Sequence, residues 1–199
     1  GIFNGFGVDT HLVFRADKVL RGFDNELREQ LMTSMVQKGI TLHKEVTISE
    51  IEKVNLNYSV KLSNGKNLNV DEVMGATGRI PKVSKLGLSD IGVDIGSRGE
   101  VLVNKFNQTN IKSIYAIGDV TDKVTLTPVA IAEGHAFADR EYGESERVIS
   151  YDNIPSAVFS QQSISVVGLT VEQAINNGVK DKKCKRKYRP QKKTGQEER

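Results

Sequence analysis

Two arginines, Arg15 and Arg21, are the first residues along the chain that could do chemistry together. Arg15 directly follows the segment 8–14, and Arg21 comes six residues later. Two guanidinium groups can hold one phosphate through paired, charge-assisted hydrogen bonds, which a single lysine cannot reproduce. Arginines at this spacing are also common as plain surface charge. The local pattern alone therefore leaves a phosphate site and a solvated surface both open.

A single carboxylate, Asp119, has a different setting. It follows the apolar run 114–117 and Gly118, and a new helix is expected to start within ten residues, at 126–128. A buried strand that ends in Gly-Asp delivers the carboxylate to the carboxyl edge of a sheet, where α/β proteins bind cofactors. The same carboxylate could instead serve only as a helix cap.

The histidines and the cysteine predict no metal site. His11 and His43 show no metal-ligand spacing, and we expect both to be structural. Cys184 stands alone, which excludes an internal disulfide and is compatible with a reducing compartment. We expect it to be an exposed thiol without a redox role.

The net charge of +3 is unevenly distributed. Residues 180–199 hold ten lysines and arginines against three acidic residues, so the rest of the chain is mildly acidic. We predict that 179–199 form a basic, disordered tail. Because Tyr188 is the one aromatic residue among these basic residues, nucleic-acid binding is not favoured. No apolar run approaches the roughly 18 residues that a membrane span needs, so no membrane partner is predicted.

The elements expected to position the arginines form a strand–helix–strand unit. The pattern predicts a strand over 8–14, a helix capped by Asp24 that runs through 38, and a strand over 40–43. A nucleotide-binding unit of this kind carries an acidic residue at the end of its second strand for NAD and basic residues for NADP. Arg15 at that position would suit NADP, but the local pattern does not separate this interpretation from plain surface charge.

The remaining pattern predicts an antiparallel meander followed by a mixed segment. The meander strands are expected at 47–54, 58–62 and 68–70, with a tight turn at Asn64-Gly65. Further strands are expected at 101–103, 114–117, 157–159 and 165–167. Two more helices are expected. One is capped by Thr127, with Pro128 at its first position, and runs to about 142; the other has a capping box of Thr170 and Gln173.

Taken in this order, the motifs resemble those of the FAD- and pyridine-nucleotide-dependent disulfide reductases. Residues 113–120 with 126–134 resemble the second flavin-contacting segment of that family. Residues 13–24 resemble the NADPH-selecting loop of glutathione reductases and their trypanothione-reducing relatives, and 75–81 resemble the segment where the chain returns to the FAD domain. The resemblance covers residues 1 to about 178.

The resemblance implies an α/β fold, part of a flavoprotein with two dinucleotide-binding domains. Residues 1–80 are expected to form the C-terminal part of the NADPH domain, with the meander at 47–70. Residues 81–148 would be the returning segment of the FAD domain. Residues 149–178 would begin the α+β interface domain through which the intact family forms homodimers.

The resemblance also implies site residues. For NADPH, Arg15 and Arg21 would bind the 2′-phosphate, and the further contacts would be Gly78, Thr125 and Ala157. For FAD, Asp119 would bind the ribityl chain, with Gly118 beside it and Thr127 at the pyrimidine edge of the ring. His135 stands where some glutathione reductases carry an arginine that meets a glutathione carboxylate; it could equally be a helical histidine without a role.

The activity implied for the intact enzyme is reduction of oxidised glutathione by NADPH through FAD and a cysteine pair. The family's FAD-binding glycine motif, cysteine pair and acid–base histidine have no counterpart here. We therefore expect a middle fragment with no catalytic residue and no turnover by itself, from the cytoplasm or an organelle or plastid stroma and not secreted. The alternatives are a trypanothione- or mercuric-type reductase, or a non-catalytic binding module with a basic tail.

Overall fold

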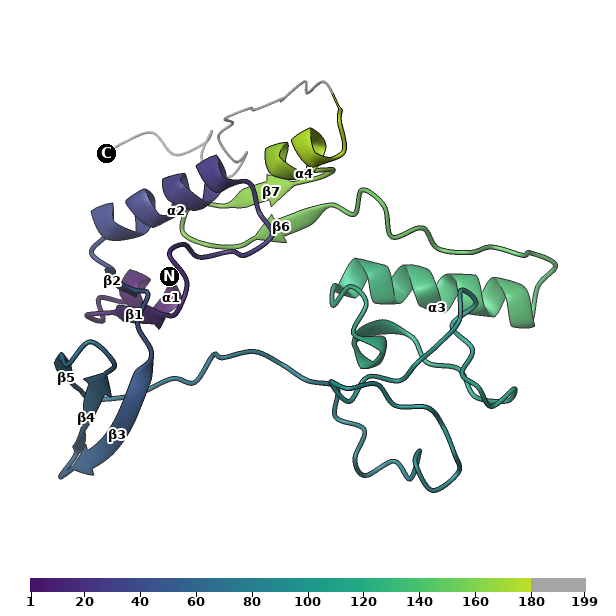
Figure 1. Ribbon diagram of the computed structural model, residues 1–199, viewed down its shortest axis with the longest axis horizontal. Coiled ribbons are helices and arrows are strands. Elements are labelled where there is room, and N and C mark those ends of the chain that lie inside the picture. The colour runs from purple at the N-terminus through teal and green to yellow at the C-terminus, as the bar shows by residue number, and fades with distance from the viewer. Residues whose placement is uncertain (180–199) are drawn as a thin grey trace, which may run out of the picture. The chain divides into compact units, whose positions relative to one another are not determined.

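The computed structural model describes residues 1–179 of the chain (Figure 1). Residues 180–199 of the predicted disordered tail, Cys184 among them, lie outside the described residues. Contacts divide the chain into two compact units. The first holds Gly1–Glu72 and the chain from Asn153 onward, and the second holds Val73–Asp152. The predicted arginine site lies in the first unit and the predicted Asp119 site in the second.

The first unit contains the expected strand–helix–strand arrangement. After the short helix α1 (Ile2–Gly5), strand β1 (His11–Phe14) pairs in parallel with β2 (Thr41–Lys44), and helix α2 (Asn25–Gln37) connects them. Asp24 caps α2 by accepting a hydrogen bond from the Glu26 amide at 3.1 Å, as predicted. Because the two strands are parallel, the loop after β1 begins at the carboxyl edge of this pair.

The antiparallel meander is confirmed. Strands β3 (Ile48–Val54), β4 (Asn57–Leu62) and β5 (Asn67–Val70) pair in that order. The backbone N–H of Leu62 donates to the Lys66 carbonyl at 2.8 Å, which closes the turn at Asn64-Gly65, and Gly65 has a φ of +83° that suits glycine. Leu62 is the best-buried apolar side chain of the meander, at 1% exposure.

The last part of the first unit is a hairpin followed by a helix. Strands β6 (Ser156–Val158) and β7 (Ile164–Val166) are antiparallel, and helix α4 (Val171–Asn176) follows. Thr170 and Gln173 form both hydrogen bonds of the predicted capping box. The Gln161 amide donates to the Gly1 carbonyl at 2.8 Å, so the hairpin lies against the start of the chain.

The second unit corrects two strand predictions. Residues 101–103 and 114–117 form no strands; the described chain has only isolated bridges there, between Ile95 and Val101 and between Gln108 and Tyr115. An apolar segment becomes a strand only where a neighbour pairs with it along its length. In this unit the structure places turns beside both segments instead.

The helix after Asp119 also starts differently from the prediction. Helix α3 (Thr127–Glu141) has Leu126 in its cap position, with no side-chain capping bond, so Thr127 is the first helical residue and not the cap. The Leu126 carbonyl accepts from the amides of Val129 and Ala130, at 3.0 and 3.1 Å. Leu126 has an extended backbone, and Pro128 fits the first turn because it needs no N–H partner there.

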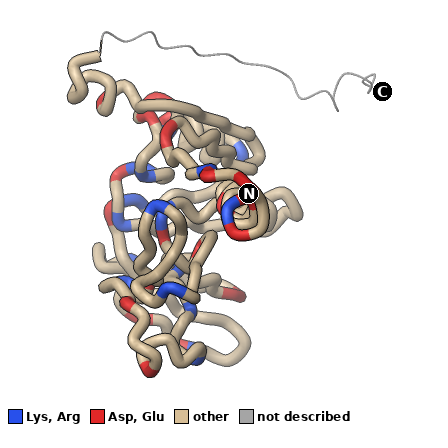
Figure 2. The backbone as a smooth tube through the Cα atoms, turned by 90° about the vertical axis from the view of Figure 1, so that its right-hand side faces the viewer, with Lys and Arg blue, Asp and Glu red and all other residues tan. Residues whose placement is uncertain are grey.

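The hydropathy of the helices and the distribution of charged residues in the described chain bear on whether it could bind a membrane or a nucleic acid. None of the helices in residues 1–179 has the length and apolar character that a membrane span requires. Acidic and basic residues are interspersed along the described backbone (Figure 2).

Candidate functional site

The loop between β1 and α2 carries Arg15 and Arg21. Both side chains are exposed, and neither forms an ion pair or a hydrogen bond with any residue of 1–179. Arg15 follows the last residue of β1, at the carboxyl edge of the parallel pair. The loop therefore presents two guanidinium groups whose donors are available to an anionic ligand.

Lys18, in the same loop, is engaged differently. Its ammonium group lies 2.8 Å from the Glu29 carboxylate, and the side chain is only 23% exposed. Its charge is already paired, so the two arginines are the cations of this loop that remain open to a ligand.

The Asp119 site is built on a turn that requires glycine. Gly118 has a φ of +70°, and a Cβ there would stand 3.0 Å from the Cβ of Ala130 on α3. The 3₁₀ helix η1 (Gly118–Thr121) begins at this residue. The Asp119 side chain, 52% exposed, lies 3.8 Å from the Arg79 guanidinium. The carboxylate is thus accessible at the start of a fixed turn.

A buried carboxylate that sequence reasoning missed holds this turn. Glu133, on α3, is 1% exposed, and its carboxylate accepts hydrogen bonds from the Gly118 amide and from the Tyr151 hydroxyl. Lys123 Nζ lies 3.4 Å from that hydroxyl. A carboxylate in the stretch 129–137, which is otherwise apolar except for His135, was the only sequence signal of this role. Glu133 is a positioning residue for Gly118 and, through it, for Asp119.

The same network perturbs Tyr151. Burial, reinforced by the hydrogen bond to Glu133 and its negative charge, raises the pKa of Tyr151 from 10.0 to about 12. The phenol therefore stays neutral and keeps donating to Glu133 well above neutral pH.

This shift predicts an alkaline loss of stability. The folded state favours the neutral phenol, so this contribution is complete below pH 10 and is lost as the pH rises toward 12. In urea unfolding measured between pH 9 and 12, we expect Tyr151→Phe to flatten this part of the pH dependence. Tyr142→Phe is the matched control, since that side chain is 85% exposed. An unchanged pH profile in Tyr151→Phe would contradict the assignment.

The other predicted contacts fall in both units. Gly78, with a φ of +131°, Thr125, Thr127 and the helical His135 are exposed and lie with Asp119 in the second unit, whereas Ala157 is exposed in β6 of the first. The pair Arg79–Asp119 brings the Gly78 segment to the Asp119 turn. The residues predicted to contact FAD, Gly118, Asp119 and Thr127, thus lie in one unit. The predicted NADPH contacts fall in both units, and their joint arrangement stays a prediction.

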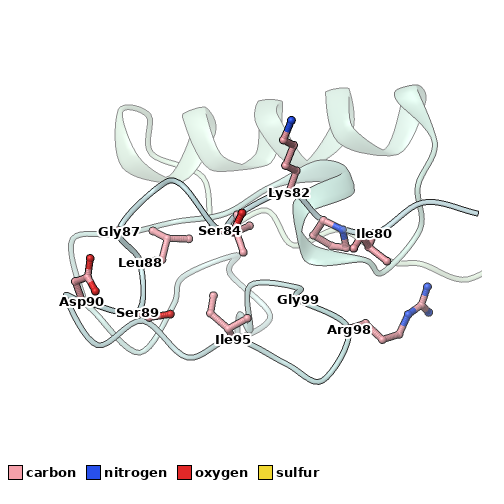
Figure 3. Close-up of a pocket in the computed structure, with 12 residues that line it drawn as sticks. Ile80, Lys82, Ser84, Gly87, Leu88, Ser89, Asp90, Ile95, Arg98 and Gly99 are labelled. Atoms are coloured by element: carbon pink, nitrogen blue, oxygen red, sulfur yellow. The ribbon is translucent and has the colours of Figure 1, made fainter.

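A separate cavity of about 610 Å³ lies in the second unit and is lined by the end of the return segment, Ile80 and Pro81, and by residues between 82 and 99. Figure 3 shows Leu88 and Ile95 projecting into it while Arg98 points outward. Arg98 pairs with Asp122 at 3.0 Å. The predicted cofactor residues do not line this cavity, so it is distinct from both candidate sites.

Within the described residues, no group of three or more His, Cys, Asp or Glu side chains is placed to hold a metal. His11 and His43 stack on neighbouring strands, with Nδ1 of the first 2.9 Å from Nε2 of the second. Burial and the neighbouring His11 lower the pKa of His43. This pair is a local contact between β1 and β2.

Comparison with known proteins supports the predicted disulfide reductase family. The family model for pyridine nucleotide-disulphide oxidoreductases matches residues 1–134. The chain is 44% identical to a glutathione reductase of Burkholderia cepacia over 174 residues, which is 87% of this chain and 39% of that protein. It is 41% identical to a trypanothione reductase of Trypanosoma congolense, covering 89% of this chain and 37% of that one.

Solved structures of flavoprotein disulfide reductases have the same fold as this chain. The HOCl-induced flavoprotein disulfide reductase RclA of Escherichia coli superposes with a TM-score of 0.83 at 26% identity, over 89% of this chain and 41% of that one. The chain spans about two fifths of the length of these relatives. The expected fold class and family are confirmed. The chain belongs to the pyridine nucleotide-disulphide oxidoreductases, the flavoprotein family that uses FAD and a pyridine nucleotide.

Proposed function

We propose that this chain supplies the NADPH-selecting loop and part of the FAD site of an NADPH-dependent glutathione-disulfide reductase. The observation that carries the proposal is the pair of exposed guanidinium groups, Arg15 and Arg21, in the loop that leaves the carboxyl edge of β1. Neither has a partner among residues 1–179. A ribose 2′-phosphate is the anion that distinguishes NADPH from NADH, and a pair of arginines suits it.

The backbone at Gly78 also fits the binding of a nicotinamide dinucleotide. Gly78 has a positive φ and nothing within 4 Å of a Cβ position, so backbone there is open to close approach. We assign Thr125 and Ala157 as further contacts of the same cofactor. When bound, NADPH would supply the hydride.

The residues of the second unit fit FAD. The turn at Gly118 presents an accessible Asp119 carboxylate, which can accept hydrogen bonds from ribityl hydroxyl groups. Thr127 opens α3, whose first amides and dipole favour negative charge nearby. FAD would carry electrons from NADPH toward a disulfide, and this chain's part is to hold and orient it.

Oxidised glutathione is the proposed substrate, because the matched relatives include glutathione reductases at 44% and 39% identity. His135, exposed on α3, is the proposed contact to a glutathione carboxylate. We assign residues 1–80, 81–148 and 149–178 to the NADPH, FAD and interface domains, the last supporting a homodimer. The proposed compartment is the cytoplasm or an organelle stroma; one relative is a chloroplastic/mitochondrial glutathione reductase of Pisum sativum.

A second candidate is a trypanothione reductase, favoured by the 41% identity to the Trypanosoma congolense enzyme. The NADPH loop serves both activities equally, so it does not separate them. Comparing turnover of the two disulfides by the protein isolated from its natural source decides between them.

The proposal is tested by the discrimination between 2′,5′-ADP and 5′-AMP, which differ only in the 2′-phosphate. Calorimetric titration of the 199-residue chain at low salt should give about 100-fold tighter binding of 2′,5′-ADP, because each charge-assisted hydrogen bond contributes about 1.5 kcal/mol or more. Equal affinities for the two nucleotides, or binding of neither, would contradict the proposal.

A further inference from the structure

The two phosphate-binding candidates lie on a segment without regular structure. Between Phe14 and Asn25 the chain forms bends and turns only. Ordering a flexible loop around a ligand costs conformational entropy for each residue that becomes fixed. A loop that is already fixed before binding avoids most of that cost. Whatever holds this loop therefore helps to decide how well Arg15 and Arg21 bind.

Arg28, in the second turn of α2, makes the contacts that hold the loop. Its Nε donates to the Val19 carbonyl at 2.7 Å, and its Nη2 donates to the Lys18 carbonyl at 2.9 Å. Its Nη1 donates to the Asn25 side chain at 3.1 Å, and the Asp17 carboxylate lies 3.8 Å from Nη2. The side chain is only 15% exposed. All three nitrogens of the guanidinium are used inside the protein.

These bonds stand directly before a strained turn. Leu20 has a φ of +54°, which is uncommon for a side chain of this kind, and Gly22 has a φ of +90°. The Phe23 amide donates to the Leu20 carbonyl at 3.1 Å and closes the turn around Arg21. A residue stays in such a conformation only where its surroundings determine it. The two carbonyls held by Arg28 precede Leu20 immediately.

We infer that Arg28 is a positioning residue that fixes the β1–α2 loop and so determines the preference for a 2′-phosphate, without touching that phosphate itself. This inference rests on the proposed NADPH function. A lysine could not replace it, because one ammonium group lacks the planar fork that reaches two carbonyls and an amide together. The pair Lys18–Glu29 is a second, weaker tie, since the Glu29 side chain is 63% exposed.

The test measures binding of 2′,5′-ADP and of 5′-AMP to the full 199-residue chain and its variants. Arg28→Gln is expected to weaken 2′,5′-ADP binding about tenfold or more and 5′-AMP binding by less than about twofold, since the contact proposed for the loop is with the added phosphate alone. Arg28→Lys, which retains the charge, should show the same pattern. If Arg28→Gln does not fold, the same two affinities are measured on Arg28→Lys. Lys53→Gln, in the meander, is the charge-matched control and should change neither affinity.

Hydrogen exchange measures directly whether the loop has become more mobile. The amides of residues 18–23 should exchange faster in both Arg28 variants, with α2 unchanged. If both nucleotides weaken equally, or neither does, the inference is overturned. Normal binding by Arg28→Lys would also overturn it, because charge alone would then suffice. If the unaltered chain shows no preference for 2′,5′-ADP, the proposed function itself fails, and this outcome is distinct from the others.

Discussion

Replacing Arg15 and Arg21 together by glutamine is expected to remove the discrimination between 2′,5′-ADP and 5′-AMP. The double variant should bind 2′,5′-ADP about 100-fold more weakly, because two charge-assisted contacts of about 1.5 kcal/mol each are lost. Binding of 5′-AMP should stay within about twofold of the original value. Both side chains are exposed and have no partners in residues 1–179, so folding should be unaffected.

The control removes the same charge elsewhere. Lys53→Gln with Lys61→Gln changes two cations of the meander, one over the Tyr58 ring and one 4.0 Å from Glu50. This variant should keep the discrimination. If it loses the preference as fully as the arginine variant does, long-range charge and not a local pair of guanidinium groups selects the nucleotide.

The second large effect is expected at Asp119. Asp119→Ala should weaken FAD binding by about 10- to 100-fold, because a carboxylate that accepts hydroxyl donors contributes about 1.5–3 kcal/mol. The affinity is measured from the quenching of FAD fluorescence as the 199-residue chain is added. Since the Asp119 side chain is 52% exposed and, within residues 1–179, makes only a 3.8 Å pair with Arg79, the variant should fold normally.

Asp139→Ala is the comparison for this effect. Asp139 lies on α3 in the same unit and pairs with Arg147 at 3.5 Å. It has no proposed contact with the flavin. Equal FAD affinities of the Asp119 and Asp139 variants would mean that Asp119 is only a turn residue, the alternative that its position after an apolar run left open.

Sequence reasoning succeeded where the stabilising contacts are local. The Asp24 cap, the turn at Asn64-Gly65 and the Thr170–Gln173 capping box each use bonds between residues a few positions apart. Such bonds depend on residue type and spacing, so the sequence predicts them well. The parallel pairing of β1 and β2 follows from the helix that connects them.

Sequence reasoning failed where a distant partner decides the structure. Residues 101–103 and 114–117 have the apolar pattern of strands, but a strand also needs a neighbour along its length, and pattern alone does not supply one. Thr127 has the residue type of a cap, but the backbone of Leu126 takes that position.

The supporting residues were the hardest part of the site to predict. Arg28 and Glu133 bind backbone groups, the carbonyls of residues 18 and 19 and the amide of Gly118. Any residue type offers such groups, so no motif marks the partner. Arg15, Arg21 and Asp119 could be nominated because a ligand, unlike a backbone carbonyl, calls for particular side chains.

The most direct test of the account is the state of the 2′-phosphate of NADP⁺ when this chain binds it, followed by phosphorus NMR across pH. A free phosphate monoester takes up its second proton near pH 6. Two guanidinium groups favour the doubly charged form, so the bound 2′-phosphate should titrate about one pH unit or more lower. The Arg15, Arg21 double variant should restore the free value. The contradicting result is a 2′-phosphate that titrates as in free NADP⁺ when the chain is saturating, with no difference between the unaltered chain and the double variant. It would mean that this loop does not select NADPH.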